Sequence, residues 1–201
     1  MVENSITAAL YLLAMINPIS KICILSVFTQ EEKQYHMSRV LIRSSAIALF
    51  ILLISMAAGE IILQKIFYVE LYSLKLSGGI ILFLVGFKAL TKGVFFDVDT
   101  KNRFEDLSIV PLASPMIAGP ATIAASLSLS SQYGFLSTAG AIFMASGLNL
   151  IFMLLAKPIG HILMKYNFMG ALIRLTGLIV STIGAQMMLS GLMEWIKPLI
   201  S

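Results

Sequence analysis

The longest uncharged stretch of the chain decides its structural class. Between Asp106 and Lys157, 50 consecutive residues carry no formal charge, and a helix needs only about 20 apolar residues to cross a bilayer. The whole chain of 201 residues is 58% apolar and 12% charged, whereas a soluble domain carries about 25% charged residues. An outer-membrane barrel would alternate apolar and polar residues over strands of roughly ten residues, and the sequence lacks that pattern. The sequence therefore predicts an all-α, polytopic integral membrane protein.

Apolar windows between charged and turn residues predict six transmembrane helices. The predicted spans are Ile6–Phe28, Val40–Leu63, Leu71–Leu90, Leu107–Ser130, Phe135–Ala156 and Gly170–Met193. The loop Thr91–Asp106 holds a cluster of acidic and basic residues and separates the first three spans from the last three. We expect residues 1–93 to form a first three-helix repeat, residues 94–106 a cytoplasmic linker, and residues 107–201 a second three-helix repeat.

The basic residues predict the orientation of these spans, because the cytoplasmic loops of membrane proteins are rich in Lys and Arg. With the N-terminus outside, ten basic residues face inward: Lys33, Arg39, Arg43, Lys88, Lys92, Lys101, Arg103, Lys157, Lys165 and Arg174. Only three face outward: Lys65, Lys75 and Lys197. We therefore predict a multi-pass membrane protein with both termini outside. Glu3 stands where a signal peptide needs Lys or Arg, so we expect the first span to be retained.

The third and sixth predicted spans share a pattern that indicates an internal repeat. Lys75–Gly78 (Lys-Leu-Ser-Gly) resembles Arg174–Gly177 (Arg-Leu-Thr-Gly). Glycines recur every seven residues in both spans, at Gly79, Gly86 and Gly93 and again at Gly177, Gly184 and Gly191. Because seven residues fall about 20° short of two helical turns, each series forms one stripe, and such a stripe admits close approach by another helix.

The first and fourth predicted spans are each interrupted in the middle. Asn17-Pro18-Ile19-Ser20 stands opposite Gly119-Pro120-Ala121-Thr122 in the second half. Proline has no N–H and its ring collides with the carbonyl four residues back, so each break frees backbone groups that lipid cannot satisfy. Because each repeat has three spans, an odd number, the second repeat enters the membrane in the opposite sense to the first. We therefore predict two inverted three-helix repeats with broken first and fourth helices. Paired breaks of this kind indicate a transporter site, whereas a lone proline would indicate a kink.

The polar residues around the two breaks are the candidates for substrate binding. Asn17 and Thr122 are the best candidates for hydrogen bonds to a substrate, whereas Ser114 is expected to bond between helices. Lys21 is the only formal charge near the middle of a span; it either serves function or extends toward the membrane surface. The complete predicted site comprises Asn17, Pro18, Ile19, Ser20, Lys21, Ser77, Gly78, Gly119, Pro120, Ala121, Thr122, Thr176 and Gly177.

Several other functions are disfavoured by the residues that the chain has. Cys23 is the single cysteine, which excludes an intrachain disulfide and a cysteine metal cluster. All three aspartates lie in the central loop, so no intramembrane pair of catalytic carboxylates can form. The net charge of +4 arises from scattered basic residues, so we expect no nucleic-acid partner. We also expect no enzymatic activity, no metal and no cofactor.

The sequence resembles the MarC/SnatA family of inner-membrane proteins along its whole length. The resemblance rests on Met15–Ile19 (Met-Ile-Asn-Pro-Ile), Ser77–Phe83, Ile109–Pro120 (Ile-Val-Pro-Leu-Ala-Ser-Pro-Met-Ile-Ala-Gly-Pro) and Arg174–Ile179. It implies a secondary transporter of small neutral amino acids, of the glycine and alanine type, built from two inverted three-helix repeats with discontinuous first and fourth helices. The implied partners are the amino acid, a coupling ion (proton or sodium), the lipid bilayer and, as a further expectation, a second copy of the chain.

This chain departs from the family pattern just after Pro18. Relatives usually continue with Gly-Asn and a second proline, where this sequence has Ser20, Lys21, Ile22 and Cys23. A cation at this point either serves the substrate carboxylate, replaces a coupling ion, or shifts specificity toward more acidic substrates. Two alternatives to an amino acid transporter stay open: a non-transporting scaffold or subunit, and an exporter of another small metabolite. A passive channel is disfavoured because the polar residues cluster at mid-membrane instead of lining a continuous lumen.

Overall fold

The computed structural model describes residues 2–28, 34–95 and 112–200, and every regular element in these ranges is helical. The α-helices are α1 (Val2–Ile16), α2 (Pro18–Phe28), α3 (Gln34–Ile61), α4 (Leu71–Lys92), α6 (Pro120–Tyr133), α7 (Phe135–Leu154), α8 (Ala156–Lys165) and α9 (Met169–Ile200). Two segments are π-helical, η1 (Ile62–Ile66) and η3 (Leu112–Ile117). The predicted all-α class is confirmed for the described residues.

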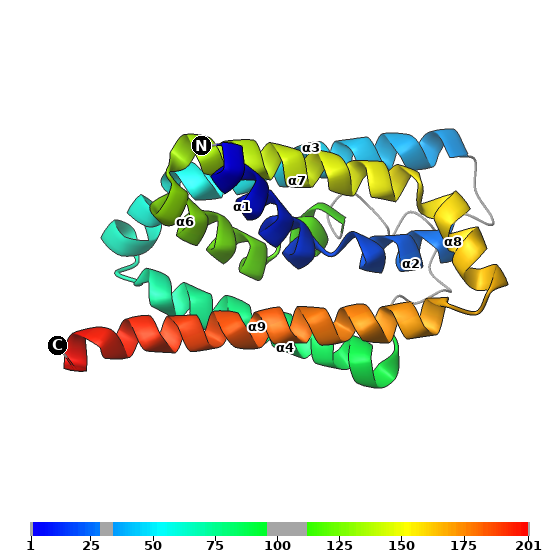
Figure 1. Cartoon of the computed structure of the whole chain (residues 1–201). Helices are drawn as coiled ribbons and strands as arrows, with labels where there is room; N and C mark the ends of the chain where they lie inside the picture. Colours follow the sequence, from blue (N-terminus) through cyan, green and yellow to red (C-terminus); the bar gives the residue numbers. More distant parts are fainter. Residues whose placement is uncertain (1, 29–33, 96–111, 201) are drawn as a thin grey trace.

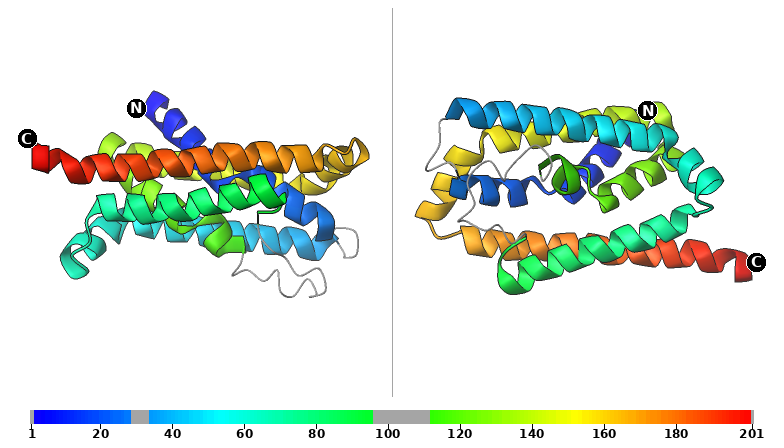
Figure 2. Two further views of the ribbon diagram at one scale, coloured as in Figure 1. Left: turned by 90° about the horizontal axis from the view of Figure 1, so that it is seen from below. Right: turned by 180° about the vertical axis from the view of Figure 1, so that it is seen from behind.

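The helices form three layers (Figure 1). The broken helices α1, α2 and α6 lie in the middle, with α3 and α7 on one side and the long pair α4 and α9 on the other. The view from behind in Figure 2 shows the same order. The first span is accordingly the most buried, 61% against 28–39% for the other long apolar helices. The breaks predicted from the sequence therefore lie at the centre of the bundle.

Five helical segments are long and apolar enough to cross a membrane. They are Glu3–Ser26, Met37–Gly59, Leu71–Lys92, Phe135–Leu154 and Met169–Lys197, and each overlaps a predicted span closely. The short helix α8 was not predicted, because it lies in a stretch that the hydropathy assigned to a loop. The membrane class is confirmed by these five segments.

The predicted fourth span consists of two pieces where it is described. The π-helical segment η3 ends at Ile117, and α6, with 14 residues, begins at Pro120. The first residues of that span, and residues 96–106 of the predicted linker, lie outside the described residues. The count of six spans and the division into repeats and linker therefore stay predictions.

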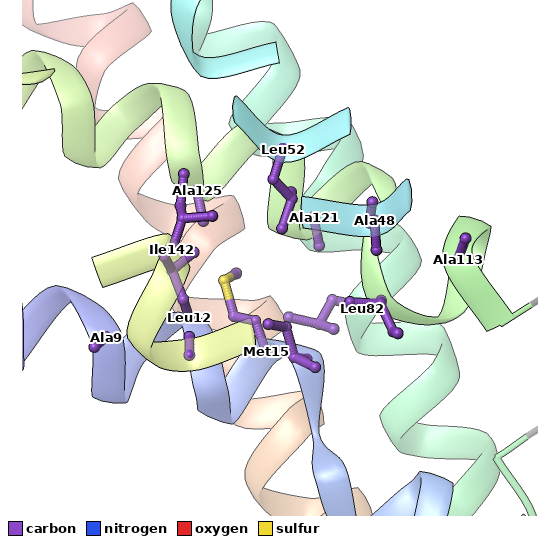
Figure 3. Close-up of a cluster of buried hydrophobic side chains, with 14 of the residues drawn as sticks. Ala9, Leu12, Met15, Ala48, Leu52, Leu82, Ala113, Ala121, Ala125 and Ile142 are labelled. Carbon is purple, nitrogen blue, oxygen red and sulfur yellow. The ribbon is translucent and has the colours of Figure 1, made fainter. Parts of the chain in front are cut away.

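Apolar residues fill the interior and also cover the outside. Figure 3 shows part of this core, with side chains from α1, α3, α4, η3, α6 and α7: Ala9, Leu12, Met15, Ala48, Leu52, Leu82, Ala113, Ala121, Ala125 and Ile142. Large apolar side chains are equally common on the outer faces; Leu10, Phe50 and Met193 are 61%, 65% and 70% exposed. Apolar patches of this extent are unfavourable in water and suit lipid as the surrounding solvent.

The glycine stripes pack α4 directly against α9 in antiparallel orientation. A Cβ added at Gly79 would lie 2.8 Å from the carbonyl oxygen of Gly184, and one added at Gly86 would lie 2.7 Å from the carbonyl oxygen of Gly177. Gly191 meets the backbone of Tyr72 in the same way, at 2.8 Å. Since only glycine permits this approach, the predicted close helix contact is confirmed for these five glycines.

The contact between these stripes is reciprocal. At the sequence offset of 98, Gly79 corresponds to Gly177 and Gly86 to Gly184, and each glycine touches the counterpart of the other. An element related to its partner by a two-fold axis makes this self-complementary contact, so the packing of α4 on α9 agrees with an inverted repeat. Gly93 is an exception: it ends α4 with φ of 72° and has no neighbour within 4 Å. Its predicted place in the stripe is wrong, because the helix stops there.

Basic residues gather at one end of the bundle. Because α4 and α9 are antiparallel, Lys88, Lys92 and Arg174 lie at the same end, next to α8 with Lys157 and Lys165. This is the end predicted to be cytoplasmic. Of the basic residues predicted to face inward, Lys33, Lys101 and Arg103 lie outside the described residues. The orientation in the membrane stays a prediction.

Candidate functional site

The first break separates α1 from α2 at a single residue. Asn17 has φ of 53°, in the left-handed region, which Asn tolerates better than most residues. Its N–H still donates to the carbonyl of Leu13, at 2.9 Å. The next residue, Pro18, has no N–H to donate to the carbonyl of Ala14. The chain therefore cannot continue one helix, and it starts a new one at Pro18, where a proline is well tolerated.

Side chains of this break bond to its own backbone. The side-chain oxygen Oδ1 of Asn17 accepts a hydrogen bond from the Ser20 N–H at 3.3 Å and so caps α2. The Ser20 hydroxyl donates to the Asn17 carbonyl at 2.7 Å. Lys21 Nζ donates to the carbonyl of Ile16, the last residue of α1, where a cation is favoured by the helix dipole. Lys21 is only 1% exposed, so its side chain folds back into the break and does not extend toward the membrane surface.

The second break is left uncapped. Gly119 is extended, with φ of −81° and ψ of 167°, and precedes α6 without any side-chain cap. Because Pro120 occupies the first helical position, the N–H groups of Ala121 and Thr122 are those that the first turn leaves free. The Thr122 side chain is 4% exposed, and its hydroxyl makes no hydrogen bond with any residue that the structure describes. This helix end offers donors to an anion.

The two breaks meet at one cavity of about 210 Å³, which is partly open to the outside of the bundle. Its polar lining residues are Asn17, Ser20, Lys21 and Thr122, and its apolar lining includes Met15, Ile81, Leu82, Val85, Phe95, Met116 and Val180. At roughly 30 Å³ per water molecule, the volume corresponds to a small metabolite. It is below the range of about 300–1,000 Å³ that is typical of sites for drug-sized ligands. A buried cation beside an uncapped helix N-terminus gives the cavity a positive potential on one side.

The structure brings together part of the predicted site. Seven predicted residues line the cavity: Asn17, Ser20, Lys21, Gly119, Pro120, Ala121 and Thr122. Pro18 and Ile19 are half-buried and belong to the same break, but they do not line its wall. Ser77, Gly78, Thr176 and Gly177 do not line the cavity either. These four belong to the repeated motif of the third and sixth predicted spans, and their predicted role in substrate binding is not supported by a place in this wall.

The contacts of those four residues explain their positions. Ser77 is exposed and donates to the Leu74 carbonyl at 3.1 Å. The Thr176 hydroxyl is buried but donates to its own helix, to the Leu172 carbonyl at 2.7 Å. Gly177 packs on α4, and Gly78 packs on α6, where an added Cβ would lie 3.1 Å from Ala121 Cα. Gly78 and Gly177 therefore serve helix packing, whereas Ser77 and Thr176 bond within their own helices.

The apolar lining of the cavity was missed at the level of sequence. Phe95 follows the end of α4, and Val180 lies within α9 among other apolar residues. Nothing in the sequence pattern distinguishes these two residues from lipid-facing neighbours. In the described ranges, no group of three or more His, Cys, Asp or Glu residues gathers where it could hold a metal ion. The chemistry that the cavity offers is therefore hydrogen bonding and charge, within a small apolar enclosure.

Comparison with known proteins gives a consistent result over nearly the full length. The model of the MarC family of integral membrane proteins matches residues 2–196. A UPF0056 membrane protein of Pyrococcus horikoshii is 33% identical over 95% of this chain and 94% of its own length. The UPF0056 inner membrane protein YhgN of Escherichia coli is 31% identical, over 96% of this chain and 98% of its own. No solved structure matches the chain. From the family match and these relatives, the chain belongs to the MarC family of integral membrane proteins.

Proposed function

We propose that this protein is a secondary transporter of small neutral amino acids in the plasma membrane of a bacterium or archaeon. One observation carries the proposal: two proline breaks from the two halves of the chain meet at a small, mostly apolar cavity whose few polar groups come from the breaks, inside a membrane bundle. Paired interruptions at matching places are the usual sign of a transporter binding site. An inner-membrane relative, YhgN, supports the assignment to that membrane.

The polar groups of the cavity suit the carboxylate of an amino acid. The N-terminus of α6 offers backbone N–H groups, and the Thr122 hydroxyl lies beside them without a partner among the described residues. Lys21 has three donors and uses one on the Ile16 carbonyl, so two remain for a ligand. A carboxylate in this position satisfies donors that otherwise stay unpaired in an apolar enclosure.

The remaining walls favour a short, neutral side chain. Leu82, Val85 and Met116 line the cavity with apolar atoms, which offer nothing to a second charge. The volume of about 210 Å³ leaves room for glycine or alanine with some water and excludes bulky side chains. The substrate ammonium is left to oxygen atoms at the first break, such as the Asn17 side chain.

Alternating access follows from the two kinds of helix contact. The pair α4 and α9 is locked by its glycine contacts, whereas the broken helices α1, α2 and α6 have no comparable seam. We infer that one group of helices rocks against the other around the cavity, coupled to a proton or sodium gradient. Carbonyl groups released at the end of α1 are suitable ligands for a small cation.

A non-transporting scaffold is the second candidate, and one observation disfavours it. As a scaffold, the chain would use the glycine stripes as assembly surfaces for other subunits. The stripes instead pack against each other within the chain, so they are not available to a partner. A scaffold also has no need of a polar cavity, since freed backbone groups are unfavourable at membrane depth.

Uptake by the purified protein in liposomes tests the proposal. We expect accumulation of labelled glycine or alanine under an imposed proton or sodium gradient, and no accumulation of bulky or acidic amino acids. Thr122→Val should reduce the uptake, while Thr182→Val should not, because Thr182 faces outward and bonds its own helix at 2.9 Å. Absence of uptake for the whole panel, with folded protein in the liposomes, would contradict the proposal. Export is tested by loading the same liposomes from within.

A further inference from the structure

A second and larger cavity lies toward the end of the bundle where α4 begins and α9 ends. Its volume is about 580 Å³, and it is lined by α1, α4, α6 and α9. Most of its lining residues are polar: Thr7, Tyr11, Lys75, Ser128, Ser131, Gln132, Tyr133, Ser190 and Glu194. The predicted orientation places this end at the outer side of the membrane. A polar recess of this size is not needed for packing in lipid.

The two cavities lie in line along the same four helices. We call the larger cavity the outer cavity and the cavity at the breaks the inner cavity. On α1 the outer cavity reaches Tyr11, and the inner cavity starts at Met15, one turn further along the helix. On α6 the outer cavity reaches Ala125 and the inner one Ala121, again one turn apart. Because both helices carry the two cavities on the same face, the outer cavity leads toward the inner one.

A narrow contact separates the two cavities. A Cβ added at Gly78 would lie 3.1 Å from Ala121 Cα and 3.2 Å from Met187 Cε. Ala121 lines the inner cavity and Met187 lines the outer one. Gly78 therefore lies against the lining of both cavities, and the contact includes a methionine, whose side chain is the most adaptable of the apolar ones.

The charged lining of the outer cavity consists of one acid and one base. Lys75 Nζ bonds the carboxylate of Glu194 across α4 and α9, and the two side chains are 11% and 47% exposed. Beside them, Ser128 and Gln132 make no hydrogen bond with any residue that the structure describes. A zwitterion carries the same two charges at a fixed short separation. When a zwitterion binds, the Lys75–Glu194 ion pair is replaced by two ion pairs. Lys75 then pairs with the carboxylate of the ligand, and Glu194 pairs with the ammonium of the ligand.

We propose that the outer cavity is a separate binding site for a zwitterionic amino acid, from which the ligand passes the Gly78 and Met187 contact to the cavity at the breaks. The identity of the ligand rests on the proposed function. The location of the two sites, their charges and their order along the bundle are argued from the structure alone and do not depend on the proposed transport. The site selects zwitterions over ligands with one charge, because a single charge leaves Lys75 or Glu194 unpaired.

Thiol labelling from outside tests this site, since Cys23 is the only cysteine of the chain. In a Cys23→Ala background, Ser128→Cys should react with a membrane-impermeant reagent in intact cells. Thr182→Cys, on the lipid-facing side of α9, should not react. L-alanine at ten times its Kd should slow the reaction about tenfold by occupancy. Propionate and ethylamine, each with one of the two charges, should give no protection.

Charge variants connect the protection to the ion pair. Lys75→Met with Glu194→Gln should abolish protection by alanine, and the exchanged pair Lys75→Glu with Glu194→Lys should restore it. The restoring variant separates loss of binding from loss of folding. Lys197→Met is the matched control on α9, because Lys197 is exposed and outside the cavity, and it should behave as the parent does.

The outcomes separate this site from the proposed function. Labelling that no amino acid slows, with uptake into liposomes intact, would overturn the outer site and leave the transporter. Protection by alanine without uptake would keep the site and remove the transport proposal. Equal protection by propionate would contradict a zwitterion site, and labelling only from the cytoplasmic side would contradict its outer position.

Discussion

The two helix breaks begin alike in sequence and end differently in structure. At the first break, Asn17 and Lys21 bond the backbone that the break exposes. At the second break, Gly119 supplies no side chain and α6 begins uncapped. Thr122 lines the cavity, and its hydroxyl has no partner among the described residues. The same local pattern, a small residue followed by a proline, thus gives two different breaks. At the first, side chains of the break bond the exposed backbone groups; at the second, no side chain does.

This difference indicates that the two breaks have separate tasks. A buried donor without a partner costs about 1–3 kcal/mol, so unpaired donors that line a cavity are candidates for ligand binding. The side chains of the first break mainly fix the shape of the chain, whereas the donors of the second break are left for the ligand. The predictions that follow test this division, beginning with the frame that both breaks share.

The largest effect is expected at the frame. In Gly184→Leu, the new Cβ would lie 2.4 Å from Phe83 N and 2.8 Å from the Gly79 carbonyl oxygen. Both are backbone atoms, so α4 and α9 must separate along their length, and we expect loss of most folded protein. Gly147→Leu is the control, since it has no neighbour within 4 Å. Yield and Tm in detergent measure the effect; a normal Tm for Gly184→Leu would show that the two breaks do not depend on this frame.

The next effect is a loss of stability at the first break. Asn17→Ala forces an alanine into the left-handed region, at about 1–2 kcal/mol, and removes the cap on α2, at about 1 kcal/mol. We expect the free energy of unfolding to fall by about 2–3 kcal/mol. Asn17→Gly should recover most of it, because glycine accepts φ of 53°. If Asn17→Ala keeps the parent stability and loses only ligand binding, the division between the breaks is wrong.

Lys21 links the two breaks, so its replacement gives a mixed and smaller effect. Lys21→Met removes a donor from the Ile16 carbonyl but also removes a charge from the interior, and these changes in stability oppose each other. Affinity for alanine should fall about tenfold, or ~1.4 kcal/mol, through the lost partner of the carboxylate. A titration of ethylamine, which has no carboxylate, is the comparison. An equal loss for both ligands would remove Lys21 from the carboxylate site.

The fold class was predictable from composition because lipid demands long apolar helices. The breaks were also predictable, since proline has the same backbone chemistry wherever it stands. The helices are interrupted at Asn17 and at Gly119, as expected. The glycine stripes identified the contact of α4 with α9. Gly93 is the exception because spacing alone does not reveal where a helix ends.

The lining of the site was only partly predictable. Polar residues near the breaks reach the cavity, because few polar side chains occur at that depth and each one is informative. Ser77 and Thr176 satisfied the repeat but bond their own helices, and the sequence does not show which face of a helix they occupy. The pairing of Glu194 with Lys75 across the outer cavity was likewise not visible in the sequence. Contacts between distant segments decide such cases.

The most direct test of the division between the breaks is a binding titration with Thr122→Val. The change removes one hydroxyl and keeps the shape, so the Tm without ligand should stay that of the parent, while affinity for alanine falls about fivefold, or ~1 kcal/mol. Thr182→Val is the control, because the Thr182 hydroxyl donates to the Leu178 carbonyl of its own helix at 2.9 Å. This variant should bind alanine as the parent does. Unchanged affinity in Thr122→Val, at equal stability, would show that the uncapped end of α6 is not where the substrate binds.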